Sequence, residues 1–138
     1  MNRSENLYQT ETTKGTAQFA RDFEGICKKY DFVINNSDSM DMKKTFISHG
    51  GVVPDDFDLH MMQVCKPTKA DKSLTANPER AILMPKFVMV FSKDRKTQIR
   101  YMSYSAADIA EMVPDDLGFP KSLAETFAKI RSMIDEAK

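Results

Sequence analysis

Two long segments of the chain carry apolar residues at helical spacing. The first stripe consists of Phe19, Ala20, Phe23, Ile26, Cys27 and Tyr30. Steps of three and four residues place these side chains on one face of a helix, and we expect Thr12 or Thr13 to cap its first turn through a hydroxyl oxygen. The second stripe predicts a final helix from Ser122 to Ala137 and consists of Leu123, Phe127, Ile130 and Ile134.

The segments between these helices have the patterns of strands and short connecting helices. The predicted strands cover residues 5–11, 32–34, 57–65, 86–92 and 97–105, and the predicted short helices cover residues 39–49, 68–74 and 105–112. Capping hydroxyls at Ser39 and Ser105 begin two of these helices, and Asp94-Arg95-Lys96 supplies the turn of a hairpin. Asp115-Asp116 follows a proline and also predicts a turn. The order of elements predicts an α+β fold, with helices on one face of an antiparallel sheet.

The predicted strands are apolar on both faces. In residues 57–65 one face carries Phe57, Leu59, Met61, Gln63 and Cys65, and the other carries Asp58, His60, Met62 and Val64. An antiparallel sheet with one face in solvent alternates apolar and polar residues, so helices on one side leave the second face to be explained. Three arrangements would cover it: a second copy of the chain in a homodimer, a small ligand or cofactor, or a third layer of helices. We favour the homodimer.

Composition narrows the class of protein. A chain of 138 residues makes one domain, residues 1–138. The 20 Lys+Arg balance the 20 Asp+Glu, so we expect no nucleic acid and no membrane as partner. No apolar run approaches the ~18 residues of a membrane span, and the first residues lack the layout of a signal peptide. Two widely spaced cysteines form no disulfide framework, so we expect a cytoplasmic protein.

His60 is the candidate ligand for a metal-containing cofactor. It lies in the middle of a predicted strand between two apolar residues, and its neighbour on the same face is Met62. A histidine in a methionine-rich setting is suited to the iron of haem b. The alternative is a histidine in the core or at an interface that makes a hydrogen bond to the backbone.

Cys65 is the candidate reactive thiol. It comes directly before a predicted helix and beside Lys66, and both the helix N-terminus and the lysine favour the thiolate. The alternative is a structural thiol, which is the interpretation we give to Cys27 in the stripe of the first helix.

Several motifs after residue 30 resemble those of a known family. They are Asp31–Ile34, Met42–Lys44, Val64–Leu74, Asn77–Pro85 and Phe87–Phe91. Together they resemble the bacterial domain-of-unknown-function 302 family over residues 5–105, with an extra C-terminal helix at about residues 121–138. The resemblance implies a TATA-binding-protein-like α+β arrangement, a curved antiparallel sheet with helices on one face, often dimeric. It implies no catalytic residues.

Two departures from the family pattern change the expected chemistry. The family's Cys-Asn-Pro is here Cys65-Lys66-Pro67, and the position of a second family cysteine is Lys86. A dithiol function is therefore not expected. Lys66 and Lys86 would instead place positive charge near Cys65, suited to a carboxylate or a haem propionate. The sequence thus favours a non-enzymatic, homodimeric binding domain for an unidentified small ligand. The alternatives are a b-type haem protein using His60 and a sulfur or redox function of Cys65.

Overall fold

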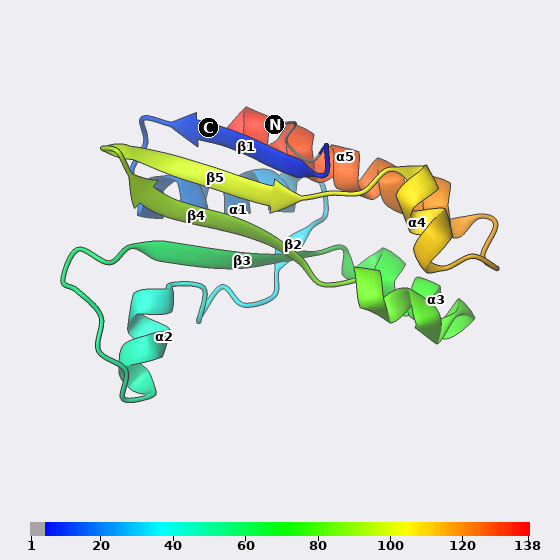
Figure 1. The fold of residues 1–138 in the computed structure, drawn as a ribbon, viewed down its shortest axis with the longest axis horizontal. Helices are drawn as coiled ribbons and strands as arrows, with labels where there is room; N and C mark the ends of the chain where they lie inside the picture. The colour runs from blue at the N-terminus through cyan, green and yellow to red at the C-terminus, as the bar shows by residue number, and fades with distance from the viewer. Residues whose placement is uncertain (1–4) are drawn as a thin grey trace.

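The computed structural model describes residues 5–138 and contains one antiparallel sheet of five strands (Figure 1). The strands are β1 (Leu7–Thr12), β2 (Val33–Ile34), β3 (Leu59–Cys65), β4 (Lys86–Lys93) and β5 (Lys96–Met102), in the spatial order β1-β5-β4-β3-β2. The α+β class and the antiparallel sheet predicted from the sequence are confirmed.

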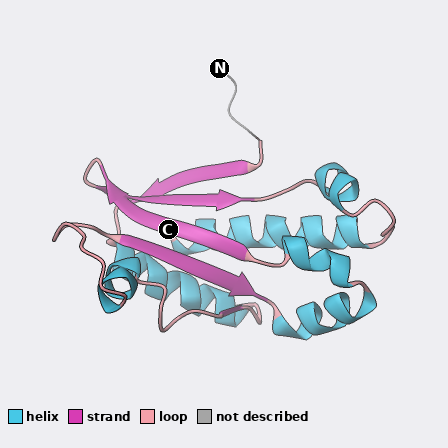
Figure 2. Ribbon diagram, turned by 60° about the horizontal axis from the view of Figure 1, so that its bottom comes forward, coloured by secondary structure: helices cyan, strands magenta, loops and turns pink. Residues whose placement is uncertain are grey.

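Two long amphipathic helices lie together on one side of this sheet (Figures 1 and 2). They are α1 (Thr16–Lys29) and α5 (Phe119–Ala137), and they contact each other as well as the core. The core side chains that they bury include Phe19, Phe23, Met62, Val88, Val90, Ile99, Tyr101, Ile130 and Ile134. Cys27 is buried among them, and burial raises the pKa of its thiol to about 12. It is therefore part of the core, as its position in the stripe predicts.

Three shorter helices lie between strands, and a fourth joins β5 to α5. They are α2 (Met42–Ser48), α3 (Pro67–Ala76), the 3-10 helix η1 (Pro78–Leu83) and α4 (Ala106–Met112). Ser105 caps α4 as predicted, because its hydroxyl accepts from the backbone N–H of Asp108 at 3.2 Å. The other predicted caps are wrong. Gly15 precedes α1 without a side-chain cap, and the carboxylate of Asp41, not the hydroxyl of Ser39, accepts from the first turn of α2.

The β4–β5 hairpin turns through two residues in the left-handed region. Asp94 has φ 57° and Arg95 has φ 64°, the conformation of a two-residue turn that follows the twist of the strands. The hairpin sets the register in which Val88 lies opposite Tyr101 and Val90 opposite Ile99.

The second face of the sheet is half-buried. Its apolar side chains are Leu59, Met61, Phe87, Met89, Phe91 and Met102, of which Met102 is 45% exposed. The second face is therefore apolar over β3 and β4, whereas β5 places Gln98 and Arg100 on it, opposite Phe91 and Met89. Only the face under α1 and α5 is fully packed. No helix within residues 5–138 is both long enough and apolar enough to cross a bilayer.

Candidate ligand-binding cleft

A cleft of about 220 Å³ opens at the end of the sheet where β3 ends and β4 begins. In Figure 1 this is the end of the sheet beside α3. One wall comes from α3 and η1, and the opposite wall comes from the first half of α5. The volume is below the ~300–1,000 Å³ of pockets for drug-sized ligands, so the cleft suits a small molecule.

The floor of the cleft is apolar because it is continuous with the core. It is formed by Phe32, Val64, Met84, Phe119, Leu123 and Ile130. Of these, Val64 of β3 and Ile130 of α5 are fully buried, at 1% and 0% exposure. A ligand in this cleft would therefore bury apolar surface against a preformed wall.

Basic side chains supply the charges in the lining. They are Lys66, Lys69, Arg80 and Lys86, and no aspartate or glutamate accompanies them in the part of the chain that the structure describes. The chain as a whole has a formal net charge of +0. The concentration of positive charge in the cleft therefore cannot be inferred from the composition. Such an arrangement attracts anions.

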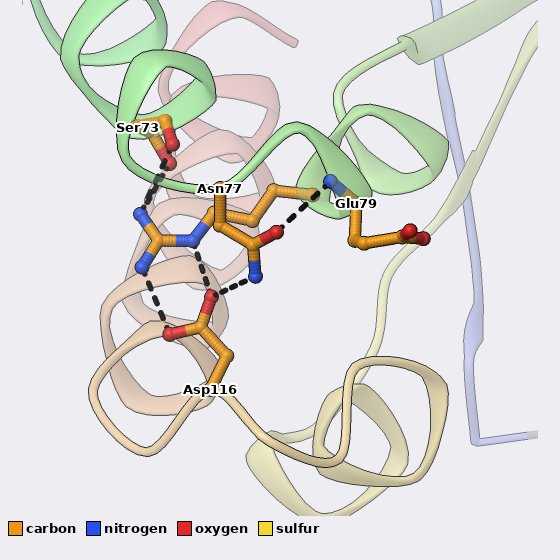
Figure 3. Close-up of polar contacts among 5 residues, drawn as sticks. Ser73, Asn77, Glu79 and Asp116 are labelled. Atoms are coloured by element: carbon orange, nitrogen blue, oxygen red, sulfur yellow. Dashed lines mark hydrogen bonds and ion pairs between the residues drawn. The ribbon is translucent and has the colours of Figure 1, made fainter.

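Arg80 is the one of these four whose charge is neutralised by the protein. Its Nη2 donates to Asp116 Oδ1 at 2.8 Å, its Nε donates to the second carboxylate oxygen, and its Nη1 donates to Ser73 Oγ at 3.0 Å (Figure 3). Asn77 Nδ2 also donates to Asp116, at 3.0 Å. The hydrogen bonds from Arg80 lower the pKa of the Asp116 carboxyl to about 2.

This hydrogen-bond network has a structural role, because it holds the walls of the cleft in place. Because Asp116 precedes α5 and Arg80 lies in η1, the bidentate pair holds the two walls together. The guanidinium also lies 4.6 Å from the ring centroid of Phe119. Neither Arg80 nor Asp116 was singled out as a site residue from the sequence, because Asp115-Asp116 predicts only a turn. A spacing of 36 residues gives no local signal for the pair.

Lys86 is the buried charge of the cleft. It is 8% exposed, its Nζ donates to the carbonyl oxygen of Met84 at 3.2 Å, and it lies 5.6 Å from the ring centroid of Phe127. Its ammonium group forms no ion pair with any residue of the described chain. Burial lowers the pKa of Lys86, the Cys65 thiol opposes this shift, and the charge of Lys69 adds to it.

The rim of the cleft carries Cys65 and the start of α3. Cys65 is a half-buried free thiol at the end of β3, and it interacts electrostatically with Lys86. Lys66 is the residue that precedes Pro67 at the N-terminus of α3, and its Nζ lies 5.0 Å from the ring centroid of Phe32. Lys69 follows one turn later and is exposed. The sequence had not indicated Lys69.

The structure brings together three of the five residues singled out from the sequence. Cys65, Lys66 and Lys86 all line the cleft. His60 and Met62 do not, because they face the helices further along β3, where Met62 is fully buried. His60 is 8% exposed and pairs with Val90 across the sheet.

The surroundings of His60 are polar on one side. Its Nδ1 lies 4.0 Å from Asp58 Oδ1 and has no hydrogen-bond partner. Asp58 in turn accepts from the hydroxyls of Thr16 and Ser92, at 2.8 Å and 2.7 Å. Within residues 5–138, no group of three or more histidine, cysteine, aspartate or glutamate side chains is placed to hold a metal ion. Haem ligation by His60 stays a prediction.

Comparisons with known proteins agree with the fold. The family model described as "Domain of unknown function DUF302" matches residues 8–137. This range continues past residue 105 and includes α4 and α5, so it is longer than the sequence motifs indicated. A crystal structure of an uncharacterized conserved DUF302 protein from Bacillus stearothermophilus is similar, with a TM-score of 0.77 at 15% identity. The match covers 98% of this chain and 100% of that one. No curated protein matches.

Proposed function

The chain belongs to the DUF302 family, whose name gives no activity, and from the geometry of the cleft we propose that it binds a small organic anion with an apolar part. The observation that carries the proposal is Lys86, a buried ammonium group that faces a cleft and forms no ion pair with any described residue. A buried charge is unfavourable unless it is paired. An anionic group in the cleft would supply the missing partner.

The rest of the lining supports the same class of ligand. Lys66 and Lys69 add positive charge at the rim, whereas the floor of the cleft consists of apolar side chains such as Val64 and Ile130. A carboxylate would pair with the lysines, and each methylene buried on the floor would contribute about 0.8 kcal/mol. We therefore expect affinity to rise about fourfold per methylene until the cleft is full.

Titration with matched ligands tests the proposal. Octanoate and octan-1-ol have the same chain and differ in charge, and two-dimensional NMR of the protein reports both the affinity and the residues that respond. We expect octanoate to bind at least about tenfold more tightly, because a charge-assisted hydrogen bond contributes roughly 1.5–3 kcal/mol. The shifted signals should come from α3, η1 and the start of α5. Equal affinities for the two ligands, or shifts spread over the surface, would contradict the proposal.

Two variants locate the charge. Lys86→Met removes the buried ammonium and should reduce the preference for octanoate over octan-1-ol to the part that Lys66 and Lys69 supply. Lys72→Met alters an exposed lysine of α3 that does not line the cleft, and it should leave the preference unchanged.

We also infer that the second face of the sheet joins two copies of the chain. Leu59 lies opposite Phe91 and Met61 opposite Met89 on this face, and these side chains are half-buried in the single chain. Apolar patches of this kind mark interfaces, and twofold pairing is the commonest way to cover one. Light scattering at micromolar concentration should give the mass of a dimer, and Met89→Lys should give a monomer. A monomeric wild-type protein would overturn this inference.

Haem binding by His60 is a separate hypothesis with its own test. His60 does not line the cleft that Lys66 and Lys86 line, so haem ligation is tested separately from anion binding in the cleft. Titration with hemin should give a sharp Soret band that His60→Ala abolishes. A spectrum that is the same in both proteins would rule out this ligand.

A further inference from the structure

We propose that Lys86 is an amine nucleophile, and that it captures the carbonyl carbon of a small aldehyde or ketone that also carries a carboxylate. This inference rests on the proposed function, because the anion-binding rim would deliver the carbonyl compound to the amine. The product is an imine between Nζ of Lys86 and the bound molecule.

The environment of Lys86 is of the kind that makes a lysine nucleophilic. Only the neutral amine has the lone pair that attacks a carbonyl, and enzymes obtain it by desolvating lysine in an apolar site or by placing it near another cation. Both conditions are met: Lys86 is 8% exposed above a hydrocarbon floor, and the charge of Lys69 acts on it from α3. No carboxylate of the described chain pairs with the amine to hold it in the ammonium form.

The groups around Lys86 come from β3, α3, η1, α5 and the segment between η1 and β4. Burial is the largest effect on the pKa of Lys86, and it lowers that pKa. Cys65 at the end of β3 raises the pKa, and the charge of Lys69 lowers it further. The carbonyl oxygen of Met84, from the segment between η1 and β4, accepts one of its hydrogen bonds. Phe127 of α5 presents its ring. Arg80 of η1 is paired with Asp116, so its charge is offset.

The cleft places the two functional groups of such a ligand in different positions. The carboxylate would pair with Lys66 and Lys69 at the rim, and the carbonyl group would reach the deeper Lys86. Lys66 and Lys69 are more exposed than Lys86, so the cleft separates a charge-pairing position at its rim from a buried nucleophilic position.

The reaction balances without a further reagent. The lone pair of Nζ forms a bond to the carbonyl carbon, the C=O π electrons move to oxygen, and a proton passes from nitrogen to that oxygen to give a carbinolamine. The nitrogen lone pair then forms the C=N bond as the oxygen leaves with a second proton as water. The amine and the carbonyl compound thus give an imine and water, with no change in oxidation state.

Reductive trapping tests the inference. The protein is incubated with 4-oxobutanoate and sodium cyanoborohydride, which reduces the imine to a stable secondary amine, and peptide mass spectrometry locates the adduct. We expect Lys86 to be modified before the exposed lysines of the same sample, including Lys69 and Lys72. Butanal, which lacks the carboxylate, should lose this preference. Modification spread evenly over the exposed lysines, with Lys86 unmodified, would overturn the inference even without a variant.

Lys86→Arg separates this inference from the proposed function. Arginine retains a positive charge at position 86 but forms no imine under these conditions. We expect the variant to bind octanoate with a preference over octan-1-ol and to lose the fast adduct. If wild-type protein prefers octanoate but shows no selective adduct, the inference fails and the proposed function stands. If octanoate shows no preference over octan-1-ol, the proposed function fails.

Discussion

Replacing Lys86 with methionine should make the protein more stable while weakening its preference for anions. Burial of an ammonium group without a counter-ion is unfavourable by several kcal/mol, and Lys86 is 8% exposed. Methionine has a similar length and fills irregular apolar space. The variant also loses the charge-assisted hydrogen bond to the Met84 carbonyl, 3.2 Å from Nζ, which contributes roughly 1.5–3 kcal/mol. We therefore expect a net stabilisation of about 1–2 kcal/mol at neutral pH.

Thermal and chemical unfolding would both detect this change. The unfolding entropy of 138 residues is roughly 290 cal/mol/K, taking about 2.1 cal/mol/K per residue. One kcal/mol then shifts Tm by about 3.4 °C, so Lys86→Met should melt about 3–7 °C higher. Lys72→Met is the matched control, because Lys72 is an exposed lysine of α3 that does not line the cleft. Its free energy of unfolding should change by less than about 0.5 kcal/mol.

The pH dependence of the difference identifies its cause. The pKa of Lys86 is lowered in the folded state from its usual value of 10.5, so the unfolded chain binds more protons between the folded pKa and 10.5. The stability of the wild-type protein therefore rises with pH in that window relative to Lys86→Met. In urea unfolding at pH 7, 8.5 and 10, the difference in free energy of unfolding between Lys86→Met and the wild-type protein should become smaller as the pH rises. A variant that is less stable at pH 7, by an amount that does not change with pH, would refute the reasoning.

Three further predictions concern the stability of the fold. The pKa of Asp116 is about 2, so its pairing with Arg80 stabilises the fold above pH 4 and is lost as the pH falls towards 2. In acid unfolding, the free energy of unfolding of Asp116→Asn should fall less steeply between pH 4 and pH 2 than that of the wild-type protein. Arg95→Gly should raise the free energy of unfolding by about 1 kcal/mol, because Arg95 has φ 64° and glycine adopts that region freely. Ser105→Ala should lower the free energy of unfolding by about 1 kcal/mol in urea, because it removes the cap of α4.

Periodic apolar patterns predicted the elements well wherever a buried stripe was long. The stripe ending at Ile134 is the buried face of α5, and the stripe through Phe19 and Phe23 is the buried face of α1. The caps were harder to predict, because several polar residues compete within one turn. Asp41 caps α2 although Ser39 also carries a suitable oxygen. Such a choice depends on where the preceding chain meets β3, which local sequence does not encode.

The cleft was only partly predictable for a related reason. Cys65, Lys66 and Lys86 were singled out because short motifs and the family resemblance drew attention to them. Arg80 and Asp116 were missed because their pairing joins η1 to the turn before α5. Neither position stands out in its own segment, and only the packing of α5 against the sheet makes the two residues neighbours.

Polar residues that face the core mark where folding alone does not explain a sequence. The buried residues of β3 and β4 that face the helices are mostly apolar: Met62, Val64, Val88 and Val90. His60 and Lys86 are the two polar residues among them. The two exceptions differ in their surroundings. Asp58 lies 4.0 Å from His60, so the protein itself supplies a carboxylate that would pair with a protonated imidazole. Lys86 has no carboxylate partner among the described residues and opens onto a cleft instead. A buried lysine that lacks a carboxylate partner and lines a cleft is best explained by an anionic ligand that binds there.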